Sequence, residues 1–298
     1  MSETAASLGH TIASAQDLQS VVRTMKALAA SSVGQYEQSV RALADYHHTV
    51  QLGLGACFRE SPPAPIIVRH DHRDQAIGAV VFGSDQGLVG RFNDDVADFA
   101  ITTLASLQGK PKIWAVGERV HGRLADAGLE MMGLYDVPNA IQGITPLVGR
   151  IQVDSEAHRD RDGYSRVYVF HNRPKAGSSY DPVSLRLLPL DQKWRHDQAA
   201  VPWPTKRQPQ IMGEGTSTLR ALIREYLFIS LFRASAESLA SENASRLAAM
   251  QRAEKNIDDL LVDLKSSFRR QRQGTIDEEL FDVIAGFEAL KPTRKPNG

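Results

Sequence analysis

Residues 216–273 read TSTLRALIREYLFISLFRASAESLASENASRLAAMQRAEKNIDDLLVDLKSSFRRQRQ and contain neither proline nor glycine. Their apolar side chains recur at steps of three and four residues, close to a heptad seam, which predicts one continuous amphipathic helix. At about 1.5 Å per residue this helix would be roughly 87 Å long. A compact chain of 298 residues would be only roughly 50 Å across. The helix must therefore project, and its apolar stripe needs a partner.

The other end of the chain offers that partner. Between His10 and Leu52 there is no proline and one glycine, Gly34, and apolar residues again follow helical spacing. Because a globular insert joins the two helices, antiparallel pairing is the simplest arrangement. Arg233, Asn243 and Glu254 interrupt the stripe of the later helix, and we expect them to set the register or to face a partner.

The segment between the helices holds most of the glycines and all but two of the prolines. Strand patterns (76–84, 112–117, 131–138, 166–173 and 183–190) alternate with helix patterns (94–107, 118–127 and 141–156). This alternation predicts an α/β fold with a doubly wound, mainly parallel sheet that ends in an antiparallel pair. Residues 60–74 and 191–215 read as linkers. The expected domains are a coiled-coil helix at 1–59, a globular α/β domain at 60–215 and a coiled-coil helix at 216–298.

Composition excludes several classes of protein. The chain carries 35 basic and 35 acidic residues, so it lacks the net positive field of a general nucleic-acid or membrane-surface binder. Its single cysteine, Cys57, cannot form an intramolecular disulfide, which favours a reducing compartment. For Cys57 itself, a small buried or half-buried side chain is favoured over a catalytic thiol. The first residues show no signal-peptide pattern, and no apolar run is long enough to span a membrane. We expect no direct membrane insertion.

The loop GSDQGLVG at 83–90 is the best candidate for a phosphate cradle, because it follows the first expected strand. It lacks the lysine and hydroxyl of a P-loop and the spacing of a dinucleotide fingerprint, so a tight strand-to-helix turn is the favoured interpretation. Gly53 and Gly55 precede proline-rich chain rather than a helix, which argues against a nucleotide loop there.

Two histidine groups could suggest a metal site. His70, His72 and Asp74 lie close together in the sequence, but no second group of metal ligands follows at a spacing typical of a metal site. A solvated linker is therefore favoured. His47 and His48 are neighbours on an expected helix and face different ways, so they cannot chelate one ion together. The sequence predicts no cofactor and no catalytic residue.

The basic run at 268–273 is the local charge feature that stands out. Cations suit the end of a helix, so the run could simply be a solvated helix end. It could also dock acidic or carbonyl-rich loops of a partner. The pattern alone favours the solvated end.

Three stretches together resemble one family, the gamma subunit of F-type ATP synthases. The first is Ile12-Ala13-Ser14 with Gln16 and Gln19, then Met25 and Ala29-Ala30-Ser31. The second is the loop Ser84-Asp85, Gly87-Leu88, Gly90 and Phe92-Asn93. The third and most specific is Ser241-Glu242, Arg246, Ala249-Met250, Ala253, Asn256, Leu264, Arg272-Gln273, Thr275-Ile276, Glu279 and Gly286. The resemblance spans nearly the whole chain.

Four positions depart from the family pattern. Val89 stands where cysteine is usual, Arg91 where a small residue is usual, Arg269 where asparagine is usual, and Ser32 where a basic residue is usual. The cysteine pair of the chloroplast type is absent. These departures suggest a divergent bacterial branch, such as the alternative sodium-linked F-type ATPases.

The resemblance implies a rotor shaft that couples ion flow through the membrane to ATP synthesis or hydrolysis on other subunits. The implied partners are the ring of alpha and beta subunits, the epsilon subunit and the membrane c-ring, at the cytoplasmic face of the bacterial inner membrane. By match of position, Met25, Arg272 and Gln273 would meet the catch loops of the catalytic subunits, which favours contact for the basic run. A coiled-coil adaptor with an α/β binding head is the alternative; a nucleotide-binding enzyme has less support.

Overall fold

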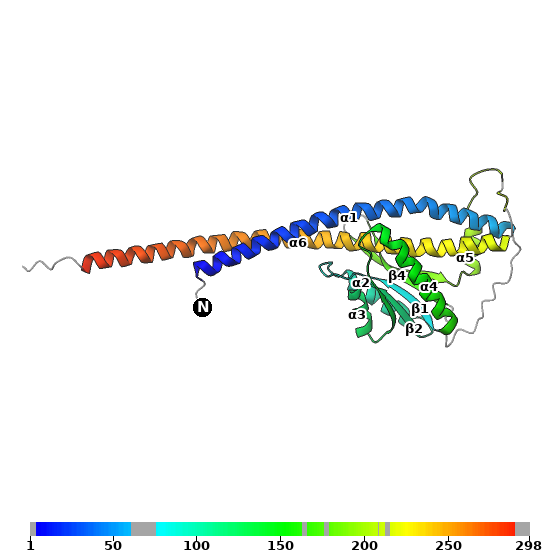
Figure 1. The fold of residues 1–298 in the computed structure, drawn as a ribbon, viewed down its shortest axis with the longest axis horizontal. Coiled ribbons are helices and arrows are strands. Elements are labelled where there is room, and N and C mark those ends of the chain that lie inside the picture. The colour runs from blue at the N-terminus through cyan, green and yellow to red at the C-terminus, as the bar shows by residue number, and fades with distance from the viewer. Residues whose placement is uncertain are drawn as a thin grey trace, which may run out of the picture. The chain divides into compact units, whose positions relative to one another are not determined.

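The computed structural model describes residues 4–60, 76–162, 166–175, 179–207, 209–211 and 215–289. A long helix opens the chain, α1 (Ala5–Glu60), and a longer one closes it, α6 (Gly215–Ala289) (Figure 1). The chain forms two compact units. Unit 1 contains residues 1–27 and 250–298, and unit 2 contains residues 28–249. Both helices run through both units, so each unit contains a part of α1 and a part of α6.

Unit 2 is built on a five-stranded sheet in the order β3-β2-β1-β4-β5. The strands are β1 (Ile77–Phe82), β2 (Pro111–Val116), β3 (Glu130–Tyr135), β4 (Arg166–Pro174) and β5 (Tyr180–Leu188). Strands β1 to β4 pair in parallel, and β5 pairs antiparallel with β4. The predicted mainly parallel sheet with an antiparallel last pair is therefore confirmed.

Helices cover both faces of the sheet. On one face, α2 (Phe92–Ala105) and α3 (Glu118–Asp126) bury their apolar sides against Ile77, Ala79 and Val81 of β1. On the other face, α4 (Ile144–Asp162) and α6 pack against Val80 and Phe82 of the same strand. Alternate residues of β1 thus enter two different cores, as the period of two in a strand requires. A short 3₁₀ helix, η1 (Ile141–Gly143), precedes α4.

Helices α1 and α6 pair antiparallel within each unit. In unit 1, a Cβ added at Gly9 would lie 3.8 Å from the ring of Phe268, and Arg23 Nε donates to Glu254 Oε1 at 2.9 Å. In unit 2, Tyr46 Oη donates to Glu225 Oε1 at 2.7 Å. Residue numbers therefore fall along α6 as they rise along α1, and the predicted antiparallel coil is confirmed.

Helix α1 runs eight residues beyond its expected end at Leu52, and the glycines that suggested a break lie inside it. A Cβ on Gly53 would come within 3.2 Å of the Leu222 side chain, and one on Gly55 within 2.7 Å of the Gln198 carbonyl oxygen. Glycine is present here because the backbones approach closely, and one helical glycine costs only about 1 kcal/mol. The expected end was wrong for this reason.

Helix α6 also continues past its expected end, through Gly274 and Gly286 to Ala289. Nothing lies within 4 Å of a Cβ added at either glycine. The stretch 275–289 is otherwise free of proline and rich in residues that favour helix, so two isolated glycines do not end it.

The expected linker at 191–215 contains a helix, α5 (Gln192–Ala199). Asp191 caps its first turn by accepting a hydrogen bond from the Trp194 backbone N–H at 2.9 Å. The Trp194 ring packs edge-on against Phe58, at 5.6 Å, and against Tyr226, at 5.1 Å. Helix α5 is thus anchored to α1 and α6 by this aromatic side chain, and Arg59 Nη1 of α1 also donates to the Ala199 carbonyl at 2.8 Å.

Candidate functional site

The three residues expected to contact a partner all lie in unit 1, but at two levels. Met25 is half-buried on α1, close to Arg23, which is bonded to Glu254 of α6. Arg272 and Gln273 are exposed on α6. Arg272 follows Glu254 by 18 positions, or about 27 Å along a helix axis. The structure therefore does not bring Met25 together with the other two residues.

Glu254, which interrupts the apolar stripe, joins the two helices beside Met25. Its carboxylate accepts hydrogen bonds from Lys26 Nζ and from Arg23 Nε, the latter at 2.9 Å. These bonds lower the pKa of Glu254, and the bond from Lys26 has the largest effect. Gln19 donates to Asp258 one turn further along. Glu254 therefore faces α1, which agrees with a role in register.

The end of α6 presents apolar side chains to solvent. Gly9 of α1 lies opposite Phe268, and α1 begins at Ala5, so the last turns of α6 extend beyond the paired region of unit 1. The exposed residues are Ile276 (52% exposed), Leu280 (56%), Phe281 (70%), Val283 (69%) and Ile284 (46%). Such a cluster at one helix end is typical of a surface that another protein covers.

The loop after β1 is a tight structural turn in unit 2. Asn93 binds Ser84 twice: its Oδ1 accepts from the Ser84 backbone N–H at 2.9 Å, and its Nδ2 donates to Ser84 Oγ at 2.8 Å. Asp85 accepts from the backbone N–H groups of Glu118, at 3.0 Å, and Val137, at 2.8 Å. A carboxylate of the chain itself thus occupies the N-terminus of α3, where a phosphate could otherwise bind. This geometry supports the turn over the phosphate cradle.

The same edge of the sheet is bonded to α6. Ser245 Oγ donates to the Val89 carbonyl at 2.6 Å, and Ser241 Oγ donates to the Asn172 carbonyl at 2.9 Å. Asn172 Nδ2 in turn donates to the Phe92 carbonyl at 2.8 Å. These bonds fix α6 against the ends of β1 and β4. The residues that carry the family resemblance in the loop and in α6 therefore meet in space.

Comparison with known proteins agrees with this arrangement. A sequence profile of the ATP synthase family matches residues 4–290. The chain belongs to this family. An ATP synthase gamma chain of Nitrosomonas eutropha is 27% identical over 297 residues, covering 94% of this chain and 97% of the relative. One of Granulibacter bethesdensis is 28% identical over 289 residues, covering 94% and 97%.

Solved structures of ATP synthases share the fold. The rotor of the Euglena gracilis mitochondrial enzyme aligns with a TM-score of 0.60 and 13% identity, over 91% of this chain and 98% of that one. The central stalk of the Tetrahymena thermophila mitochondrial enzyme aligns with a TM-score of 0.55 and 20% identity, over 78% and 99%. The family match and this fold identify the chain as the central rotor shaft of an ATP synthase.

The two departures from the family pattern in the loop are compatible with the fold. Arg91 has an exposed side chain whose Nε donates to Asp95 at 3.1 Å, so a large residue is accommodated there. Val89 is buried, 2% exposed, and contributes its backbone carbonyl to the bond with Ser245. An apolar residue of about the size of cysteine suits such a site.

A buried ion cluster in unit 2 is not visible in the sequence. Glu237 of α6 is 3% exposed, and three side chains donate to its carboxylate: His171 Nε2 at 2.8 Å, Arg173 Nε at 3.1 Å and Arg233 Nε at 2.7 Å. Burial alone would raise the pKa of Glu237, but the bonds from His171 and Arg233 lower it to about 2. Burial lowers the pKa of His171 more than the bond to Glu237 raises it, so the imidazole is neutral at pH 7.

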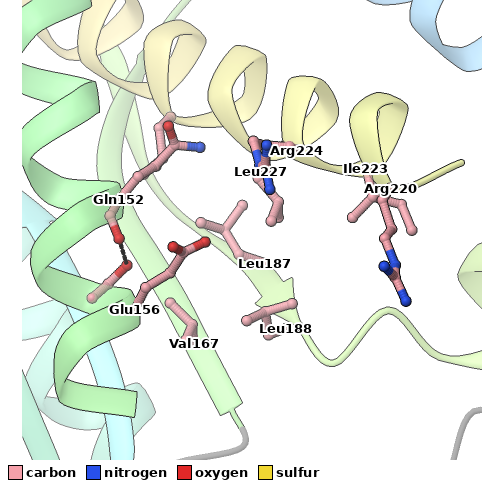
Figure 2. A pocket seen from close by; sticks show the side chains of 11 residues that line it. Gln152, Glu156, Val167, Leu187, Leu188, Arg220, Ile223, Arg224 and Leu227 are labelled. Carbon is pink, nitrogen blue, oxygen red and sulfur yellow. Dashed lines mark hydrogen bonds between the residues drawn. The ribbon is translucent and has the colours of Figure 1, made fainter. Parts of the chain in front are cut away.

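A cavity of about 270 Å³ lies where α4, the start of β4, the end of β5 and the first turns of α6 meet (Figure 2). Val167, Leu187 and Leu227 give it an apolar lining. Glu156 extends from α4, and Arg220 lies on α6. The lining combines apolar side chains with a few charged ones, Glu156, Arg220 and Arg224.

Two groups of histidines were the remaining candidates from the sequence. His70, His72 and Asp74 lie outside the described residues. His47 packs against Tyr226 with the rings tilted by 34° and their centroids 5.8 Å apart. Within the described part of the chain, no group of three or more histidine, cysteine or acidic side chains could hold a metal ion. No helix among those residues is long and apolar enough to cross a membrane.

Proposed function

We propose that α1 and the C-terminal part of α6 turn inside the ring of alpha and beta subunits that carries the catalytic sites, and that this chain has no catalytic site of its own. In this proposal, residues 1–59 and 216–298 act as the coil and residues 60–215 as the globular domain. The globular domain contacts the epsilon subunit and the membrane c-ring. The complex lies at the cytoplasmic face of the bacterial inner membrane, with this chain as a peripheral subunit.

The observation that carries the proposal is the exposed apolar end of α6. Phe281 and Val283 are each about 70% exposed. A surrounding ring would bury these side chains, at roughly 25 cal/mol per Å² of apolar surface. A smooth apolar surface also suits rotation, because apolar contact has no preferred direction.

Charged contacts would supply the angle dependence that an apolar surface lacks. We propose that Arg272 and Gln273 contact the catch loops of the catalytic subunits, and that Met25 contacts the ring at a second level nearer Glu254. A charge-assisted hydrogen bond from the Arg272 guanidinium to a carboxylate would contribute about 1.5–3 kcal/mol. If that bond forms at one rotor angle only, it couples the angle to the nucleotide state.

Reconstituted complexes provide the test. Arg272→Ala should lower coupled turnover while assembly is preserved, and Met25→Lys should impair ion pumping more than ATP hydrolysis. Arg270→Ala is the matched control, since this exposed arginine lies two positions away on another face of α6. Hydrolysis and pumping are measured side by side. Wild-type pumping per ATP in both variants would mean that the basic run is only a solvated face of α6, which continues beyond it to Ala289.

Copurification tests the wider proposal. The tagged chain should bring down a ring of subunits with ATPase activity. A chain that captures partners without this activity would support the adaptor instead.

A further inference from the structure

The buried carboxylate of Glu237 binds two arginines, each through the Nε atom of its guanidinium group. Arg173 of β4 and Arg233 of α6 each donate through Nε, at 3.1 and 2.7 Å. Their terminal Nη groups have no hydrogen-bond partner among the residues that the structure describes. Both side chains are about half exposed, 50% and 46%. Two guanidinium groups are therefore fixed at one edge and open at the other.

Both arginines line one open surface cavity of about 290 Å³, between α1, the end of β4 and α6. Arg41 and Glu37, an ion pair of α1 at 3.4 Å, line its other side. Three arginines and two carboxylates thus face this space, which leaves one net positive charge. Several fixed N–H donors around a net positive cavity are what a tetrahedral oxyanion needs, because planar guanidinium groups bind such oxygens in pairs.

We propose that this cavity binds a phosphoryl group through the terminal nitrogens of Arg173 and Arg233, with Arg41 closing the site from α1. Glu237 acts as a positioning residue, since it holds the two arginines without touching the anion. Because the arginines are already held, little side-chain freedom is lost when the anion binds. The site is separate from the rotor contacts of unit 1 and does not depend on them.

The pKa of His171 should change when the anion binds. It bonds Glu237 Oε2, the oxygen that also accepts from Arg173, is 2% exposed, and its Nδ1 is buried without a partner among the described residues. The charged or titratable groups that face it are Glu237 and Arg233 of α6 and Arg173 of β4, while His47 of α1 lines a cavity with it. An added negative charge near Arg173 and Arg233 offsets their repulsion of the imidazolium, so binding should raise the pKa of His171.

The first test is a ³¹P NMR titration of the full chain with inorganic phosphate, with chloride at equal ionic strength as the reference. We expect saturable binding by the wild type. Arg173→Gln should weaken it by about tenfold or more, the effect of losing one charge-assisted contact. Arg173→Lys should bind with intermediate strength, since it keeps the charge and loses the fork. Arg91→Gln, an exposed arginine just before α2 and outside the cavity, is the control and should bind as the wild type does.

The second test follows the His171 ring by NMR across pH. At the phosphate concentration that half-saturates the wild type, phosphate should raise the pKa of His171 in the wild type and raise it much less in folded Arg173→Gln. An equal shift with chloride, or equal phosphate binding by folded Arg173→Gln, would overturn the proposal. The proposal is also overturned if the cavity binds an acidic peptide but not phosphate.

A third arm identifies the source of the phosphoryl group. Vesicles of phosphatidylglycerol and of phosphatidylcholine are compared in sedimentation with the full chain. Binding to phosphatidylglycerol that free phosphate displaces indicates a lipid headgroup, and binding of free phosphate without sedimentation indicates a soluble ligand. Absence of both overturns the proposal.

Discussion

Replacing Glu237 with glutamine measures how much the buried ion cluster stabilises unit 2. The carboxylate is 3% exposed and accepts from His171, Arg173 and Arg233. A fall of its pKa from the ordinary 4.5 to about 2 corresponds to about 3 kcal/mol in favour of the charged form. Glutamine keeps the size and one acceptor but removes the charge that faces two arginines. We expect the free energy of unfolding at pH 7 to fall by about 2–3 kcal/mol.

Chemical denaturation followed by tryptophan fluorescence is the assay, since Trp114 and Trp194 both lie in unit 2. Glu130→Gln is the control. Glu130 is 58% exposed and pairs with Lys112 at 3.7 Å, so its loss should cost about 0–1 kcal/mol. If Glu237→Gln is no more destabilising than this control, the cluster does not stabilise the fold and the reasoning is refuted.

The pH dependence of the wild type follows from the same group. Because the folded pKa of Glu237 lies below its unfolded value, its contribution is complete above pH 4.5 and is lost as the pH falls towards 2. His171 also has a lowered pKa, so the unfolded state gains a proton first and stability begins to fall below pH 6.5. Wild-type stability should therefore decline in two steps on acidification. A flat profile from pH 7 to pH 3 would contradict both assignments.

Three further outcomes are expected. Gly117→Ala should destabilise the fold by more than about 2 kcal/mol, since Gly117 has a φ of 109° and a Cβ there would lie 2.7 Å from the Ser84 backbone. A Cβ at Gly122 in α3 would meet nothing within 4 Å, so Gly122→Ala should stabilise the fold by about 0.5–1 kcal/mol. Thermal melts compare the two variants. Gly55→Ala should loosen α5 and lower the melting temperature, while Gly34→Ala, in open space on α1, should raise it. The loop after β1 should not bind ATP, because Asp85 occupies the N-terminus of α3. Micromolar ATP binding in calorimetry by Arg173→Gln, which lacks the proposed phosphoryl contact, would revive the nucleotide-binding alternative.

The antiparallel coil was predictable because its evidence is local and repeated. Apolar residues such as Val22, Ala29 and Tyr36 recur every seven positions, and all three are buried. The ends of the helices were not predictable by the same rule. A glycine that breaks a helix and one that lets α1 approach Gln198 are the same residue in the sequence, and only the neighbour in space tells them apart.

Helix α5 and the ion cluster escaped prediction for a related reason. Helix α5 has little apolar periodicity, and its apolar anchor is the side chain of Trp194, so only the cap at Asp191 marked it in the sequence. Glu237 lies 64 and 66 positions from its partners Arg173 and His171. In one sequence no pattern links such residues. The exposed apolar end of α6 was accessible in principle, since Ile276, Leu280 and Ile284 keep steps of four after Gly274.

The two environments of α6 place different constraints on the two parts of its sequence. In unit 2 the helix is a layer of the α/β fold, and residues 234–243 are buried all round, with alanine and serine at most positions. Small residues are required there because the sheet, α1 and the loop after β1 approach from different sides. In unit 1 only one stripe is buried, at Met250, Ile257 and Leu261, and the other faces are free to vary or to meet a partner. Helix α6 is buried in one unit and largely exposed in the other. The residues that stabilise the fold and the residues that can meet a partner therefore lie in separate stretches. Residues 234–246 are needed for the attachment of the α/β domain to α6, and a constraint on exposed Arg272 or Gln273 has to come from outside the chain.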